Sequence, residues 1–184
     1  MELHVIKNFI SQEDSKTIIS YIEKRFPTDD LPRTRQTVMF GKDNLNKASS
    51  PVVCGIDEVE ELVRKYTKKA TDTVRGIFEG DLEIFLSSFW LSKHYPGATM
   101  RPHSDIDSGK SPQYCNSGIL YLNDQDTGGE LFFPKINLLI KPEQGDLILF
   151  DARHKDAIHG VKKVNEFRYT IPMWFTDSLD YILD

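Results

Sequence analysis

The chain has 184 residues, a length that fits one domain able to bury a core without disulfides or a structural metal. Hydrophobic residues make up 39% of the sequence and charged residues 28%, a balance typical of globular proteins that excludes general disorder. The formal net charge of −5 argues against nucleic acid or an anionic membrane as the main partner, because such partners usually require a basic surface.

The cysteine content and the hydropathy pattern predict where the protein works. Two cysteines, Cys54 and Cys115, are too few for a disulfide scaffold or a four-cysteine zinc site, which favours a reducing compartment. The amino-terminal residues lack the pattern of a secretory signal, and no apolar run approaches the roughly 20 residues that cross a bilayer. We therefore expect a cytoplasmic protein without a membrane partner. The sequence leaves the oligomeric state open.

Residues 1–81 are predicted to be mainly helical. A short strand is expected at 5–9, and Ser11 then has the position of an N-cap for a helix whose apolar residues follow at helical spacing. Pro27 is expected to stop this helix, and a brief strand is predicted at 37–40.

A second, amphipathic helix is predicted at 57–78, closed by Gly80. It carries the one basic cluster of the sequence, which lies among acidic residues and is interpreted as a solvated face. The residues of this cluster are Arg64, Lys65, Lys68 and Lys69.

From residue 82 onward the period of the apolar residues changes to two. Eight short strands are predicted between turns rich in Gly, Pro and Asp, at 82–95, 99–105, 117–122, 130–133, 136–140, 146–150, 158–164 and 167–175. Short strands at this spacing favour an antiparallel jelly roll. The predicted fold is thus α+β and mainly β. We expect a single domain over 1–184, with the jelly-roll core at 82–178 and the helices of 1–81 packed outside one sheet.

A candidate metal site lies in this strand-rich part. His103 and Asp105 are two residues apart, so on a strand their side chains point to the same side and can reach one ion. His159 begins another predicted strand. Two histidines and one carboxylate on one face of an octahedral ion leave three positions open, an arrangement that suits Fe(II) in oxygenases. A lone His-x-Asp arises often by chance, so the motif needs its context.

The context is a series of motifs between Phe89 and Phe175. In chain order they are Tyr95-Pro-Gly97, His103-Ser-Asp105, Ile119-Leu-Tyr-Leu-Asn123, Gly128-Gly-Glu-Leu131, Gly145-Asp146 leading into Leu147-Ile-Leu-Phe150, His159-Gly-Val161, Arg168-Tyr169 and Trp174. This region resembles the catalytic core of the prolyl 4-hydroxylases, particularly the oxygen-sensing branch and its bacterial and viral relatives. These enzymes are Fe(II)- and 2-oxoglutarate (2OG)-dependent dioxygenases.

The resemblance implies a role for each matching residue. His103, Asp105 and His159 would be the iron ligands. Arg168, nine positions after His159 as in the family, would bind the distal carboxylate of 2OG, for which its planar fork is suited. Tyr121 would donate a hydrogen bond to the same carboxylate.

Other implications of the resemblance are looser. Tyr95 would line the cofactor pocket near the metal, although its gap to His103 is shorter than in the oxygen-sensing enzymes. The implied cofactors are Fe(II), 2OG and O₂, with ascorbate as a further candidate. The alternatives from the residues alone are a core aromatic for Tyr121 and a surface ion pair for Arg168. We interpret His94 and His154 as ordinary polar residues.

The implied reaction couples oxidative decarboxylation of 2OG, which yields succinate and CO₂, to hydroxylation of a C–H bond. A peptidyl proline in a protein or peptide substrate is favoured by the resemblance, while lysine, asparagine or a free amino acid stay open. A nucleic-acid demethylase would carry a second arginine six residues after Arg168, where this chain has Trp174. A halogenase would lack the carboxylate of Asp105. A non-catalytic jelly-roll binding module is the alternative from another class.

Two features bear on the substrate. Pro172 interrupts the last predicted strand, and since proline belongs at strand edges or bulges, we expect an irregular sheet there. Residues 28–50, rich in Pro, Asp, Asn, Lys and Ser, are predicted to act with the 107–116 loop as a lid that forms the walls of a substrate groove. The alternative is a plain surface loop.

Overall fold

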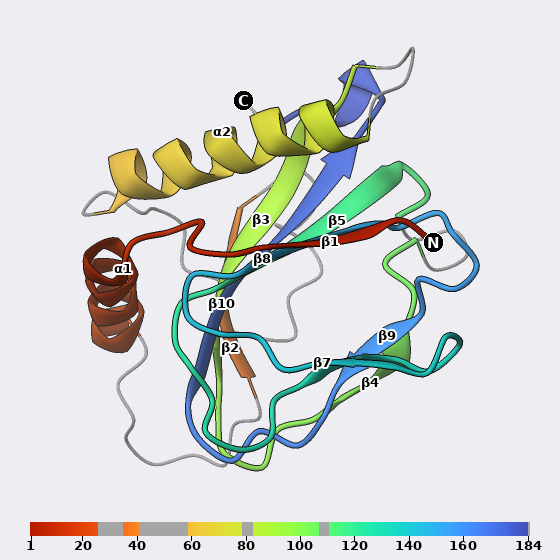
Figure 1. Ribbon diagram of the computed structural model, residues 1–184. Helices are drawn as coiled ribbons and strands as arrows, with labels where there is room; N and C mark the ends of the chain where they lie inside the picture. Colours follow the sequence, from red (N-terminus) through yellow and green to blue (C-terminus); the bar gives the residue numbers. More distant parts are fainter. Residues whose placement is uncertain (26–34, 41–58, 79–82, 107–110, 184) are drawn as a thin grey trace.

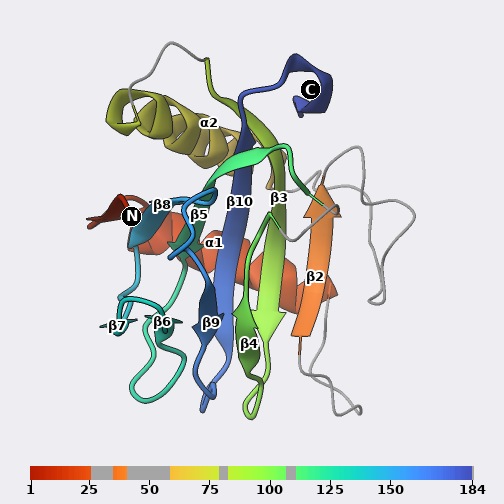
Figure 2. The same cartoon turned by 90° about the vertical axis from the view of Figure 1, so that its right-hand side faces the viewer.

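The computed structural model describes residues 1–25, 35–40, 59–78, 83–106 and 111–183, and the side chains of 35–40 are not among the described parts. Within these ranges the strands form two antiparallel sheets, and two helices lie outside the larger one (Figures 1 and 2). This arrangement confirms the predicted mainly β jelly roll.

The larger sheet consists of β1 (Leu3–Ile6), β8 (Leu147–Asp151), β5 (Tyr114–Tyr121), β10 (Arg168–Thr176), β3 (Phe85–His94) and β2 (Arg35–Phe40), in this spatial order. The smaller sheet consists of β4 (Met100–His103), β9 (His159–Val161), β6 (Leu131–Phe133) and β7 (Leu138–Ile140), also in spatial order. The helices are α1 (Gln12–Arg25), α2 (Glu60–Ile77) and a short 3₁₀ helix, η1 (Leu179–Tyr181). None of the described helices has the length and apolarity needed to cross a bilayer.

Alternate residues of the central strands serve two different cores. On β8, Leu147 and Leu149 join an outer cluster with apolar residues of α1 and α2, whereas Ile148 and Phe150 join an inner cluster with residues of the smaller sheet. Because β8 is buried on both faces, its sequence is continuously apolar rather than alternating. The helices thus cover the outer face of the larger sheet, as predicted.

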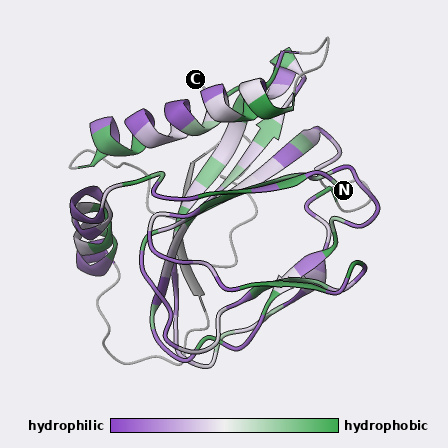
Figure 3. Cartoon of the chain, viewed as in Figure 1, coloured by the Kyte–Doolittle hydropathy of each residue, from purple (hydrophilic) through white to green (hydrophobic). Residues whose placement is uncertain are grey.

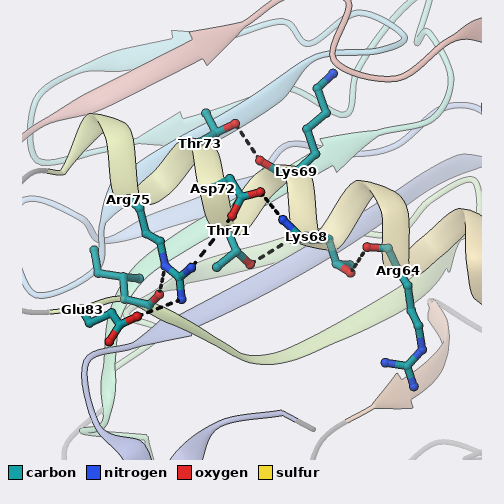
Figure 4. Close-up of polar contacts among 10 residues, drawn as sticks. Arg64, Lys68, Lys69, Thr71, Asp72, Thr73, Arg75 and Glu83 are labelled. Atoms are coloured by element: carbon teal, nitrogen blue, oxygen red, sulfur yellow. Dashed lines mark hydrogen bonds and ion pairs between the residues drawn. The ribbon is translucent and has the colours of Figure 1, made fainter.

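The outer side of α2 is polar, as the hydropathy colouring in Figure 3 shows. Arg64 pairs with Glu60 and Lys68 with Asp72, each one helical turn apart, at 2.7 and 2.6 Å (Figure 4 shows the second pair). Lys69 donates to the carbonyl of Phe9. The basic cluster is therefore a solvated face whose charges are locally balanced, as the sequence suggested.

A buried cation ties α1 to the sheet. Lys93 is 0% exposed, and its Nζ lies 2.8 Å from the Glu23 carboxylate on α1. The Tyr169 phenol donates to the same carboxylate, and the rings of Tyr95 and Phe167 face the ammonium group. Burial of a charge requires such partners, so this contact fixes where α1 lies.

The predicted elements are present, with shifted bounds in the first part. Ser11 Oγ accepts a hydrogen bond from the backbone N–H of Asp14 at 3.1 Å, which confirms the N-cap of α1. β1 ends at Ile6 instead of continuing to residue 9, because the chain turns at Asn8, whose φ is 54°. Pro27, Gly80 and most of the predicted lid at 28–50 and 107–116 lie outside the described residues.

Pro172 lies within the central strand β10, paired with Ile119 of β5. On the other side the pairing with β3 stops at Thr170 and resumes at Met173. The missing N–H of proline therefore falls where the ladder with β3 is interrupted, which makes it tolerable inside a sheet. The register shifts come further along, after Trp174. The expected irregularity is thus real but displaced toward the end of the strand.

Candidate metal centre and cosubstrate site

The structure brings His103, Asp105 and His159 together. One candidate ligand atom from each lies within 4.8 Å of the other two, close enough to hold a single ion. His103 and His159 are direct register partners on β4 and β9, and Asp105 follows β4 after one residue. We call these three residues the metal cluster.

Both histidines are held in the tautomer that metal binding needs. The Nδ1 of His103 lies 3.0 Å from the carbonyl of Arg101, and the Nδ1 of His159 lies 3.0 Å from the carbonyl of Ala157. Since a carbonyl can only accept, each Nδ1 must carry the proton. Each Nε2 is then the ring nitrogen on the side of Asp105, and the two Nε2 atoms lie 3.6 and 3.9 Å from its carboxylate.

The protonation states also suit a divalent ion. Burial alone would raise the pKa of Asp105, but the hydrogen bond from His103, the charge of His159 and the hydrogen bond from Ser117 outweigh it and hold the pKa at about 2. The Ser117 hydroxyl donates to Asp105 Oδ2 at 2.6 Å. Burial lowers the pKa of His159, with Asp105 opposing and His103 adding to the shift. At neutral pH the cluster therefore offers a carboxylate and a neutral buried imidazole.

Close packing fixes His159. The rings of Phe150 and Phe133 lie 4.9 and 5.8 Å from its ring. A side chain at Gly160 would place its Cβ 2.6 Å from the Met100 carbonyl, so only glycine lets β9 lie this close to β4.

A second cluster lies on the inner face of the larger sheet. Arg168 is 2% exposed, its Nη2 donates to the Tyr121 hydroxyl at 3.2 Å, and its Nη1 lies 3.3 Å from Nδ1 of His94. Burial raises the pKa of Tyr121, against the effect of Arg168, so the phenol stays protonated and able to donate. We call Arg168, Tyr121 and His94 the arginine cluster.

The described part of the chain supplies no anion to the arginine cluster. Among the described residues no carboxylate lies within ion-pair distance of Arg168, although its guanidinium is buried. Arg168 Nε on β10 and Ser92 Oγ on the neighbouring strand β3 are also buried, with no hydrogen-bond partner among the described residues. A buried, uncompensated cation is costly unless a ligand supplies the charge, so the cluster fits the distal carboxylate of a dicarboxylic acid such as 2OG.

The inner core joins the two clusters. Tyr121, of the arginine cluster, belongs to the same buried apolar group as Phe133 and Phe150, whose rings contact His159. The arginine cluster and the metal cluster thus border one continuous piece of the core.

Tyr95 is not part of either cluster. Its ring contacts Phe167 and Lys93, on the side of the sheet that α1 covers. His94, interpreted from the sequence as an ordinary polar residue, lies on the opposite side and contacts Arg168 instead. Strand alternation could have indicated this, because neighbouring residues of β3 face opposite sides.

An aromatic group lies beside the metal cluster. The rings of Trp90 and Trp174 are 4.5 Å apart, and Tyr114 stacks on Trp174 at 5.9 Å. All three side chains are partly exposed. Trp174 is the register partner of Ser117, which bonds Asp105, so these rings flank the metal end of the site.

Comparisons with known proteins agree with this geometry. The 2OG-Fe(II) oxygenase superfamily matches residues 89–176, the segment from β3 to β10 that holds both clusters. No curated protein sequence is significantly similar to the chain.

Solved structures of similar fold include prolyl hydroxylases. A viral collagen prolyl hydroxylase from Paramecium Bursaria Chlorella virus-1, solved with 2OG, has a TM-score of 0.67 at 20% identity, over 96% of each chain. A Trichoplax adhaerens prolyl hydroxylase, in complex with a hypoxia inducible factor peptide, has a TM-score of 0.69 at 19% identity, over 95% of this chain and 83% of that one. A Pseudomonas putida prolyl-4-hydroxylase has a TM-score of 0.66 at 17% identity, over 95% and 91%.

The match places the segment that holds both clusters in the class of 2OG-Fe(II) oxygenases. The architecture of the chain is prolyl hydroxylase-like. The family match indicates an enzyme that uses Fe(II), 2OG and O₂.

Proposed function

We propose that this oxygenase hydroxylates a peptidyl proline. His103, Asp105 and His159 hold the iron, and Arg168 and Tyr121 hold the distal carboxylate of 2OG. The observation that carries the assignment of these residues is the pairing of a three-residue metal cluster with a buried guanidinium that has no described counter-charge.

Each of the residues that hold iron or 2OG has a defined task in this proposal. When bound, iron would bring together 2OG and O₂: O₂ is the oxidant, 2OG gives up two electrons on becoming succinate and CO₂, and the second oxygen atom goes to the C–H bond. Arg168 and Tyr121 orient 2OG by a charge-assisted contact at its distal end. The carbonyls of Arg101 and Ala157 keep both Nε2 lone pairs directed at the ion.

Two observations favour a proline-containing peptide. The prolyl hydroxylases of similar fold include one in complex with a peptide. The rings of Trp90, Trp174 and Tyr114 offer this chain a partly exposed aromatic surface next to the metal cluster. Pro-rich segments dock on aromatic surfaces because they are apolar and already extended.

The cellular compartment of the enzyme is part of the proposal. Cys115 is a free, buried thiol, and burial, with the Asp177 charge adding, raises its pKa to about 11, so it is unreactive. The reducing, cytoplasmic setting is proposed from the low cysteine content of the sequence. The proposal also includes that the chain forms a single domain and that ascorbate stimulates the enzyme.

The test is mass spectrometry of host proteins and of a peptide library incubated with the enzyme, Fe(II) and 2OG. We expect peptides that gain the mass of one oxygen atom on proline, and none with Asp105→Ala. Oxygen added only to lysine, asparagine or a free amino acid would contradict the proline assignment while leaving the class intact.

A further inference from the structure

We propose that His94 is a positioning residue that orients the Arg168 guanidinium for 2OG. This inference rests on the proposed role of Arg168. It assigns a function to a histidine that no motif of the sequence includes.

The contact is built into the sheet. His94 and Arg168 are register partners on β3 and β10, with side chains on the inner face. His94 is 5% exposed and Arg168 2%, so little water can replace the contact. The distance from Arg168 Nη1 to His94 Nδ1 is 3.3 Å.

The chemistry of the two groups fixes the direction of the hydrogen bond. A guanidinium has five N–H donors and no acceptor, so Nδ1 of His94 must accept. His94 is then neutral, with its proton on Nε2. This is the opposite tautomer to that of His103 and His159, whose Nδ1 atoms face carbonyls.

The guanidinium is therefore held from two sides. His94 engages Nη1, and the Tyr121 hydroxyl engages Nη2 at 3.2 Å. Each terminal nitrogen carries two N–H groups, so one on each stays available for the two oxygens of a carboxylate. Without the His94 contact the Arg168 guanidinium could rotate. Part of the free energy of 2OG binding would then be spent on ordering it.

Two substitutions separate this role from simple packing. Asparagine places an acceptor oxygen near the position of Nδ1, whereas glutamine is closer to histidine in size but places its amide near the position of Nε2. We expect His94→Asn to bind 2OG within about twofold of the wild type, and His94→Gln to bind it about five- to tenfold more weakly. The measurement is calorimetric titration of 2OG into the Zn(II)-loaded protein, which does not turn over.

Kinetics of the Fe(II) enzyme give a second readout. For His94→Gln we expect the KM for 2OG to rise by the same factor with kcat nearly unchanged, since His94 touches no reacting atom. Equal affinities for Gln and wild type, or better binding by Gln than by Asn, would overturn the inference.

A measurement on the wild type avoids any folding defect of the variants. Nitrogen NMR of the histidine side chains should show His94 protonated on Nε2, with an Nδ1 signal that shifts in Arg168→Met. A proton on Nδ1 of His94 would overturn the inference. Failure of the wild type to bind 2OG at all would instead refute the proposed function of the whole site.

Discussion

The metal cluster and the arginine cluster are built on opposite electrostatic principles. In the metal cluster Asp105 lies between two imidazoles and receives a hydrogen bond from Ser117, so its carboxylate stays ionised although it is buried. In the arginine cluster a buried guanidinium has only neutral partners among the described residues. The first cluster is a set of ligands ready for an ion, and the second is a cation that awaits an anion.

This difference predicts that the arginine cluster, and not the metal cluster, lowers the stability of the ligand-free protein. A buried charge without a counter-charge destabilises the fold, and it is retained where a ligand provides compensation. We therefore expect substitutions in the two clusters to have different consequences for the ligand-free protein.

The largest effect is expected for Asp105→Ala. Loss of the only carboxylate of the metal cluster should weaken Fe(II) binding and lower 2OG turnover by more than about 100-fold, since even outer-shell changes cost 10–100-fold. The measurement is succinate formation together with metal titration. Asp156→Ala is the matched control, because Asp156 lies beside His154 in the same manner outside the cluster. Equal metal affinity in Asp105→Ala and the wild type would refute the assignment.

Next is Arg168→Met, which removes the buried charge but keeps an apolar chain of similar length. Binding of 2OG should weaken by about 30-fold or more, the loss of a charge-assisted contact worth at least about 2 kcal/mol. The Tm of the ligand-free protein should stay unchanged or rise by up to about 4 °C, because an uncompensated cation is gone. Calorimetric unfolding measures this second effect. A fall in Tm would show that the arginine cluster is not a destabilising feature.

Ser117→Ala should have an intermediate effect on the metal cluster. It removes the hydrogen bond to Asp105, which orients the carboxylate, and should weaken metal binding by about 10–100-fold. Ser88→Ala is the control: Ser88 pairs with Trp174 from the other side and contacts the Tyr114 hydroxyl instead. Similar metal affinities for the two variants would contradict the role of Ser117.

The smallest effect is expected for Tyr121→Phe. The ring and its packing stay, but the hydroxyl that contacts Arg168 is lost, so 2OG should bind about tenfold more weakly. Metal affinity should not change. Tyr66→Phe, which loses a hydroxyl bonded to Asp14 between the helices, should leave 2OG binding unaltered. A tenfold loss of metal affinity with unchanged 2OG affinity would contradict the assignment of Tyr121 to the arginine cluster.

The site residues that could be identified from the sequence are those whose motifs lie within a few neighbouring positions. The two-residue spacing of His103 and Asp105 on a strand predicted that their side chains point to the same side, and the surrounding motifs made a shared ion the favoured interpretation. Arg168 and Tyr121 needed the family resemblance, because their meeting depends on pairing between β5 and β10. His94 escaped both approaches, since its contact joins positions 74 apart and follows only from the β3–β10 register.

Tyr95 was expected to line the cofactor pocket, and the structure shows contacts of its ring with Phe167 and Lys93. The Tyr-Pro-Gly motif was matched by residue type, and the shorter gap to His103 was the sign that the motif could sit differently on its strand. The bounds of β1 could not be predicted either, because they depend on a turn at Asn8 that is held by Gly145 of a distant segment.

The buried ammonium group of Lys93 beneath α1 limits which insertions and deletions the strands β3 and β10 can accept. Lys93 and Tyr169 face the helix, while their chain neighbours His94 and Arg168 face the inner side of the sheet and contact each other. A single inserted or deleted residue in β3 or β10 would exchange these roles and place a helix anchor where the arginine cluster stands. Changes of two residues would preserve them. Insertions that survive selection in these strands should therefore come in even numbers, a parity rule that substitutions do not obey.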